Sequence, residues 1–214
     1  MRKNIGSDPR VHSEWMADGD PRALLRNRRR DQVLERQQAF WDAVTTKLGR
    51  PELAPRHSPH RRLGYRQTLT LPGLTQPIHV IGLDTSWLAG DEHDAGRLWL
   101  TEHQVALLTT TEAGAPLPGL RIALMHHGFA DLADAATARR GLADRVDLLL
   151  HGHQHTQTAD LLQGPDDELL VLAAGCLYEG DEGHHYLNAF QVIDLELEES
   201  ARPRRAQPAA TSNS

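Results

Sequence analysis

Residues 146–155 read VDLLLHGHQH, a short apolar run that ends in histidines at alternate positions. The run predicts a buried strand over residues 146–150. In extended backbone, residues two apart point the same way, so His153 and His155 can face one site, and Gly152 lets the chain turn tightly after the strand. Neutral imidazole is the commonest side-chain ligand for zinc, iron and manganese. The stretch therefore predicts a metal site at the end of a strand.

A second short apolar run, residues 121–125, ends at His126 and His127. Residues 131–144 between the two runs read as a helix, so strand, helix and strand form a βαβ unit whose strands are parallel. Ligands bind at the carboxyl ends of the strands in open α/β sheets. The pattern therefore predicts an α/β fold and brings His126 near the later histidines.

The rest of the chain extends this pattern on both sides. A helix over residues 22–48 is predicted upstream, and a further helix is predicted to begin with Thr101 as its N-cap, with Gln104 completing a capping box. Further strands are predicted at residues 65–71, 78–83, 169–174 and 190–197. The resulting organisation is a basic helical and loop segment at 1–63, an α/β region at 64–198 and a disordered tail at 199–214.

Composition limits the class of protein. The 214 residues are 39% hydrophobic and 24% charged, as in a soluble globular domain. No apolar run approaches the roughly 20 residues that a membrane span needs, and residues 1–3 lead into polar sequence rather than a signal peptide. The single cysteine, Cys176, excludes an internal disulfide. We therefore expect a cytoplasmic location.

Charge is concentrated at the N-terminal end. Residues 1–62 contain 14 Lys/Arg and 8 Asp/Glu, although the whole chain has a net charge of −6. Arg26, Arg28, Arg29 and Arg30 form the densest cluster. A solvated helix face and a patch for nucleic acid or phosphate both remain open, and the lack of interleaved aromatic residues favours the solvated face.

Residues 124–128, LMHHG, and the later segment HGHQH together resemble the last two motifs of the calcineurin-like metallophosphoesterase superfamily. The resemblance spans about residues 64 to 195, and it makes 64–198 the C-terminal part of such a domain. It implies a partial four-layer α/β/β/α sandwich. His126 and His153 would then bind one metal ion and His155 the other, His127 would contact the substrate as a catalytic residue or support a ligand, and His151 would end the strand.

The resemblance implies a hydrolase that cleaves phosphomonoesters or phosphodiesters with a metal-activated hydroxide. Its cofactors would be two divalent ions, manganese, iron or zinc, and its partner a phosphate-ester substrate. The family's upstream motifs, Asp-x-His, Gly-Asp-x-x-Asp and Gly-Asn-His-Asp/Glu, are not found. Residues 90–94, GDEHD, lie on the wrong side of the 78–83 strand for the last of these and are interpreted as a surface loop.

Because these motifs are missing, we expect an incomplete site that an upstream polypeptide or a partner chain completes. The alternative is a degenerate, non-catalytic module of the same fold that binds a metal ion or a partner chain. No membrane partner is expected, and nucleic acid remains a weaker alternative through the basic N-terminal segment.

Overall fold

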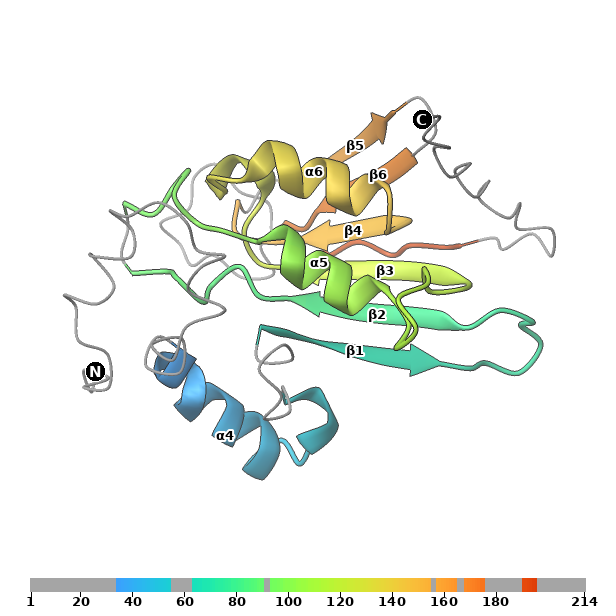
Figure 1. Ribbon diagram of the computed structural model, residues 1–214, viewed down its shortest axis with the longest axis horizontal. Helices are drawn as coiled ribbons and strands as arrows, with labels where there is room; N and C mark the ends of the chain where they lie inside the picture. Colours follow the sequence, from blue (N-terminus) through green and yellow to red (C-terminus); the bar gives the residue numbers. More distant parts are fainter. Residues whose placement is uncertain are drawn as a thin grey trace, which may run out of the picture.

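The computed structural model describes residues 34–54, 63–90, 93–154, 157–164, 168–175 and 190–195. Its centre is one six-stranded sheet with the strand order β1-β2-β3-β4-β6-β5 (Figure 1). Strands β2, β3, β4 and β6 run parallel, and the two edge strands are antiparallel to their neighbours. The strands are β1 Gly64–Leu69, β2 Ile78–Leu83, β3 Leu120–Met125, β4 Leu148–His151, β5 Thr158–Gln163 and β6 Glu168–Ala173.

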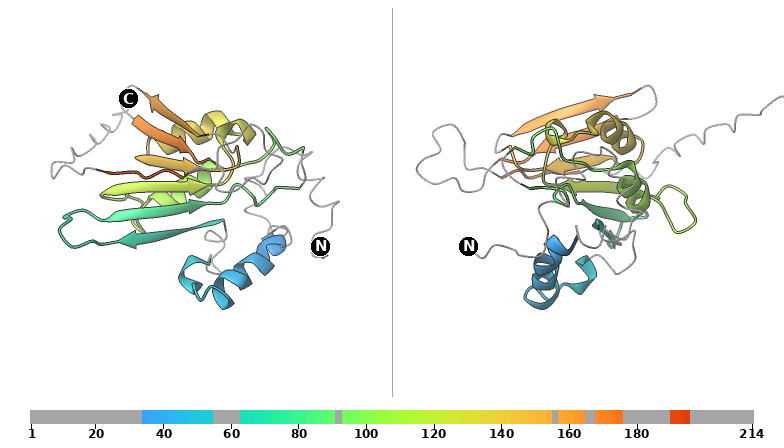
Figure 2. Two further views of the ribbon diagram at one scale, coloured as in Figure 1. Left: turned by 180° about the vertical axis from the view of Figure 1, so that it is seen from behind. Right: turned by 60° about the vertical axis from the view of Figure 1, so that its left-hand side comes forward.

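Two helices connect the parallel strands and lie on one face of the sheet (Figures 1 and 2). Helix α5, Glu102–Thr109, follows β2, and helix α6, Ala135–Ala143, joins β3 to β4. The βαβ unit predicted from the sequence is therefore confirmed, and so is the α/β class. Helix α6 begins later than predicted, because residues 132–134 do not continue the short 3₁₀ turn Phe129–Asp131 that precedes it.

The N-terminus of α5 is capped by two side chains. Thr101 accepts a hydrogen bond from the Gln104 backbone N–H at 3.3 Å, which confirms it as the N-cap. In the predicted capping box the Gln104 side chain would accept the Thr101 backbone N–H. In the structure this N–H donates instead to Asp134 Oδ2 at 2.8 Å. The Gln104 side chain instead pairs with the backbone N–H and C=O of Asp84, just past β2. That amide therefore fixes α5 against the end of β2.

The hydrophobic core lies between the sheet and these two helices. Alternate strand residues point into it and are almost fully buried, as β-strand geometry requires. Leu149 of β4 and Leu142 of α6 are both 0% exposed, and burying a leucine side chain contributes about 2 kcal/mol. The core cluster includes Ile81, Leu98, Val105, Ala123, Leu132, Leu142, Val146, Leu149, Leu169 and Val171.

The opposite face of the sheet is also aliphatic, but most of its side chains are only half-buried, although Leu148 is 4% exposed. They stand in register across four strands, since Val80 pairs with Ile122, Ile122 with Leu148 and Leu148 with Leu170. Helices α5 and α6 leave this face uncovered (Figure 2, left). The described residues thus form one sheet with helices on one side, and a second sheet of the implied sandwich is not among them.

Three segments differ from the sequence predictions. The described part of the 22–48 helix begins with a 3₁₀ turn, Glu35–Gln37, and continues as α4, Gln38–Thr46. Strand β5 was not predicted, because its residues are mostly exposed at the sheet edge and lack an apolar alternation. The predicted strand at 190–197 is wrong over residues 190–195, which form no strand. These residues run across the open face of the sheet, where no strand edge is free to pair with them (Figure 2, left).

Several predicted features lie outside the described residues. They include the arginine cluster at residues 26–30, Cys176, His155 and the tail at 199–214. None of the helices in the described part of the chain is long and apolar enough to cross a membrane.

Candidate metal centre

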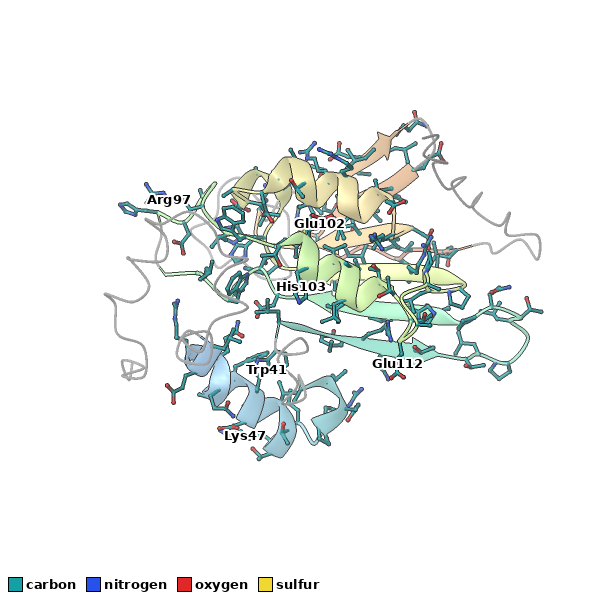
Figure 3. All side chains as sticks on the ribbon, in the orientation of Figure 1. Trp41, Lys47, Arg97, Glu102, His103 and Glu112 are labelled. Atoms are coloured by element: carbon teal, nitrogen blue, oxygen red, sulfur yellow. The ribbon has the colours of Figure 1, made fainter. Side chains whose placement is uncertain are left out.

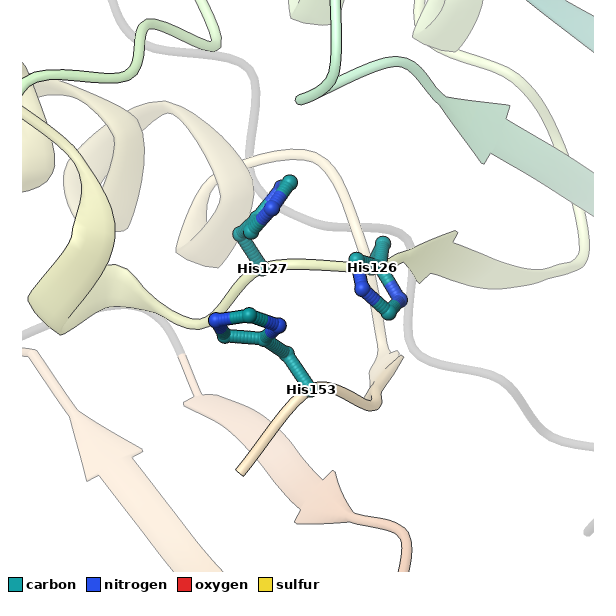
Figure 4. A group of neighbouring side chains, drawn as sticks. All are labelled: His126, His127 and His153. Carbon is teal, nitrogen blue, oxygen red and sulfur yellow. The ribbon is translucent and has the colours of Figure 1, made fainter. Parts of the chain in front are cut away.

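Three histidines meet at the edge of the sheet where the parallel strands end. His126 and His127 directly follow β3, and His153 lies two residues beyond β4 (Figure 4). One ring nitrogen from each lies within 4.8 Å of the other two, and the ring centroids are 4.7 to 5.0 Å apart. The predicted approach of His126 to the later histidines is therefore present. We call His126, His127 and His153 the histidine cluster.

The histidine cluster fits a single metal ion after a small adjustment. Imidazole nitrogens bind zinc at about 2.1 Å, so two of them on one ion lie at most about 4.2 Å apart. The 4.8 Å spread exceeds this by a distance that side-chain rotation can close. His126 and His153 are exposed and His127 is buried. Three imidazoles can therefore hold an ion on a wall that is open to solvent on one side.

The His127 ring is oriented by Thr85, two residues past the end of β2. Its Nδ1 lies 2.8 Å from Thr85 Oγ1, and the same oxygen accepts the His127 backbone N–H at 3.2 Å. A hydroxyl oxygen has two acceptor sites, so it can accept from both groups. When Nδ1 donates, Nε2 keeps its lone pair for a metal ion, which is the usual way a neighbouring group fixes the ligating nitrogen.

Burial sets the charge of His127. Burial is the largest of the effects that together lower the pKa of His127 to about 4. The neighbouring His126 and His153 also lower this pKa, while Asp131 and Asp94 raise it. The imidazole is therefore neutral at physiological pH, which is the form that binds metal ions. The influence of Asp94 places part of the 90–94 segment within electrostatic range of the cluster.

The turn after β4 carries backbone strain at His153. His153 has φ +72°, a left-handed conformation that non-glycine residues adopt uncommonly and histidine more often than most. Gly152, to which the sequence prediction assigned the tight turn, is not among the residues with positive φ. Its backbone N–H instead donates to the His126 carbonyl at 3.1 Å. That bond holds the turn against the end of β3.

The other two histidines of the HGHQH segment, His151 and His155, do not belong to the histidine cluster as described. His151 is the last residue of β4 and is 8% exposed, as predicted for a residue that ends the strand. Its ring packs so closely on Gly128 that a Cβ there would lie 3.0 Å from His151 Cε1. The prediction that His155 binds a second ion concerns a residue outside those described and stays a prediction.

Asp84, which directly precedes Thr85 in the chain, has a largely buried carboxyl group. Asp84 accepts hydrogen bonds from Gln37 Nε2 at 2.6 Å and from the Ser86 backbone N–H at 2.8 Å. Burial nevertheless raises the pKa of Asp84 to about 6, because removing a carboxylate from water outweighs these bonds. No pattern in the sequence distinguishes this group, since a single aspartate after a strand is common.

Ionisation of Asp84 is expected to destabilise the fold as the pH rises. The folded-state pKa of about 6 lies above the ordinary value of 3.8, so the contribution present below about pH 4 is lost as the pH passes 6. This difference between the two pKa values corresponds to about 3 kcal/mol in the free energy of unfolding. Urea unfolding of the unaltered chain and of Asp84→Asn between about pH 4 and pH 7 measures it. We expect the variant to gain stability relative to the unaltered chain over this range, and a constant difference contradicts the prediction.

The Thr85 hydroxyl is expected to strengthen metal binding through His127. Thr85→Val keeps the shape of the side chain but removes the contact with Nδ1, and losing such a partner costs about tenfold in metal affinity. Competition with a chromogenic zinc chelator measures the change. Thr110→Val is the control, because that hydroxyl bonds to the Ala106 carbonyl in α5, away from the cluster. Equal losses in the two variants would refute the orienting role.

Comparisons with known proteins give little further guidance. No protein-family model and no curated protein matches the sequence. Among solved structures, the chain is similar to a Staphylococcus aureus protein assigned as a 5′-nucleotidase, crystallised with alpha-ketoglutarate. The TM-score is 0.33 at 18% identity, over 51% of this chain and 23% of that chain. A likeness of this extent supports no conclusion about fold or function.

Proposed function

We propose that this chain is a metal-dependent phosphoesterase, or part of one, related to the calcineurin-like metallophosphoesterases. The observation that supports the proposal is the convergence of His126, His127 and His153 from the ends of two adjacent parallel strands. It agrees with the motif resemblance, which paired a histidine after one strand with a Gly-His-x-His after the next. The substrate would be a phosphomonoester or a phosphodiester.

The residues of the cluster have separable roles in this proposal. A divalent ion supplies an activated water at neutral pH and neutralises phosphate charge. His126 and His153, both exposed, would hold the ion on the side that a substrate reaches. His127 would bind the ion from the buried side of the cluster, with its ring oriented by the contact with Thr85. A role of His127 in contact with the substrate remains compatible with this position.

The second candidate is a non-catalytic module of the same fold. Among the described residues, the metal-binding group consists of three histidines and includes no carboxylate that could bridge two ions. The half-buried aliphatic face of the sheet also favours cover by an upstream polypeptide or a partner chain. Such a module would bind one ion and a protein partner without turning over substrate.

Hydrolysis of 4-nitrophenyl phosphate with added Mn²⁺ tests the first candidate. The substitution His153→Asn removes an imidazole while asparagine tolerates the left-handed backbone, so it changes the ligand more than the fold. His103→Asn on α5 is the matched control (Figure 3), since His103 is exposed and outside the cluster. We expect at least about a 100-fold loss of rate in the first variant alone.

Equal rates in His153→Asn and in the control would overturn catalysis by the cluster. Metal stoichiometry of the purified chain separates the two candidates further. One ion per chain with no hydrolysis supports the non-catalytic module, and two ions per chain with hydrolysis supports the phosphoesterase.

A further inference from the structure

A cavity of about 730 Å³ lies between α4 and the edge of the sheet at which β2 and β3 end. Its size is within the range of small-molecule sites, and apolar side chains form most of its wall. His126 belongs both to this wall and to the histidine cluster. A molecule in the cavity would therefore lie next to an ion held by the cluster.

Aromatic rings line the wall of this cavity. The Tyr65 ring lies across Gly82, where an added Cβ would be 2.0 Å from Tyr65 Cε1, so only glycine admits the ring. Trp87 is 1% exposed, and its Nε1 donates to the Trp99 carbonyl at 2.6 Å. Trp41 adds a third ring from the side of α4 that faces β1 (Figure 3). Flat rings favour a flat aromatic guest through stacked or edge-to-face contact.

The acceptor Gln37 Oε1 and the donor Trp41 Nε1 lie in the same wall and are buried, and neither has a hydrogen bond among the described residues. The other end of the Gln37 amide is bound to Asp84 Oδ2, so its orientation is set. Buried polar groups are normally paired, and leaving one unpaired lowers stability. A guest that carries both a donor and an acceptor would satisfy both atoms after a small shift of these side chains.

We propose that this cavity binds an aromatic ring bearing a hydrogen-bond donor and acceptor, and that the ring belongs to the alcohol part of the phosphate ester. The second half rests on the proposed function, since it places the phosphate at the histidine cluster. The shared residue His126 sets the order of the two parts, with the phosphate at the cluster and the ring toward Trp41 and Tyr65.

Binding of benzamide to the full, metal-free chain tests the cavity without any catalysis. Benzamide has one ring, one donor group and one acceptor. A ligand-detected NMR titration should give saturable binding with a dissociation constant on the order of 1 mM. We expect Trp41→Ala and Tyr65→Ala, on separate elements, each to weaken it about tenfold. Trp41→Phe should weaken it less, because a flat six-membered ring remains although the N–H and the five-membered ring of the indole are lost.

Leu48→Ala is the control for these variants. Leu48 lies just past α4, is 69% exposed and does not line the cavity, so benzamide affinity should not change. Circular dichroism shows whether each variant folds. If one of Trp41→Ala and Tyr65→Ala fails to fold, the affinity of the other tests the proposal. Absence of saturable binding, or equal affinity in the unaltered chain and both alanine variants, overturns the cavity proposal.

Two phosphonates test the link between cavity and cluster. Phenylphosphonate and methylphosphonate resist hydrolysis and differ in the ring, so calorimetry with the Mn²⁺-loaded chain measures the ring's contribution directly. We expect phenylphosphonate to bind about tenfold more tightly, and Trp41→Ala to abolish the difference. Equal binding of the two phosphonates by the unaltered chain would overturn the assignment of the ring to the substrate.

The two proposals fail in different ways. If benzamide binds and neither phosphonate does, the cavity stands and the phosphate site at the cluster is wrong. If both phosphonates bind equally and benzamide does not, the phosphate site stands and the cavity proposal is wrong.

Discussion

His153→Asn is expected to lower the affinity of the chain for Mn²⁺ or Zn²⁺ by at least about 100-fold. The cluster holds three imidazoles, and removing one leaves two ligands for the ion. Histidine-bound ions are strongly sensitive to such losses, since even an outer hydrogen-bond partner contributes 10- to 100-fold by typical measurement. Equilibrium dialysis against a metal buffer measures the dissociation constant of each ion.

Asparagine is chosen at this position because of the backbone. His153 has φ +72°, and alanine there would add strain to the loss of the ligand. His103→Asn changes the same chemistry at an exposed site on α5 and should bind metal as the unaltered chain does. If His153→Asn binds Mn²⁺ and Zn²⁺ as tightly as the unaltered chain, the histidine cluster is not a metal site.

Asp147→Ala is expected to destabilise the fold by about 3 kcal/mol. Asp147 binds the Arg121 guanidinium through both carboxylate oxygens, at 2.6 and 3.0 Å, and also accepts the Arg121 backbone N–H at 2.8 Å. The Arg121 side chain is 7% exposed, so losing its partner leaves a buried charge uncompensated. Asp147 is 30% exposed, which places the effect at the lower end of the range for buried pairs.

The midpoint and slope of urea unfolding measure this loss. Asp144→Ala is a suitable control, because Asp144 is 59% exposed and its ion pair with Arg145 is 3.6 Å long. Exposed pairs of this kind contribute about 0–1 kcal/mol. If Asp147→Ala changes the free energy of unfolding by less than about 1 kcal/mol, the interaction between Asp147 and Arg121 at the starts of β4 and β3 contributes little to stability.

The parallel core of the fold could be predicted from the sequence because its signals are local. Short apolar runs at residues 121–125 and 146–150, separated by a helical stretch, require a crossover connection. Strand β5 could not be predicted in this way, since it is exposed and is held by pairing with β6. The apolar residues at 190–195 suggested a strand, but pairing depends on a free sheet edge, which no local pattern reports.

The metal centre likewise contains some features that the sequence pattern predicts and others that it does not. The predicted meeting of His126 with His153 followed from the rule that parallel strands end at one edge. Strand alternation points neighbouring residues to opposite faces, so it assigns only one of His126 and His127 to a site. Both lie past the end of β3, where alternation no longer applies, and both join the cluster. The Thr85 contact depends on the ends of β2 and β3 being adjacent, and a lone threonine carries no signal for it.

If the cluster binds an ion as proposed, its origin in two strands also couples metal supply to folding. An ion held by residues after β3 and after β4 binds the folded chain and not the extended one, because the helical crossover must first bring the two ends together. By mass action, free metal at 100 times its dissociation constant adds about 2.7 kcal/mol to the free energy of unfolding. The thermal stability of this protein then becomes a readout of the free metal concentration around it.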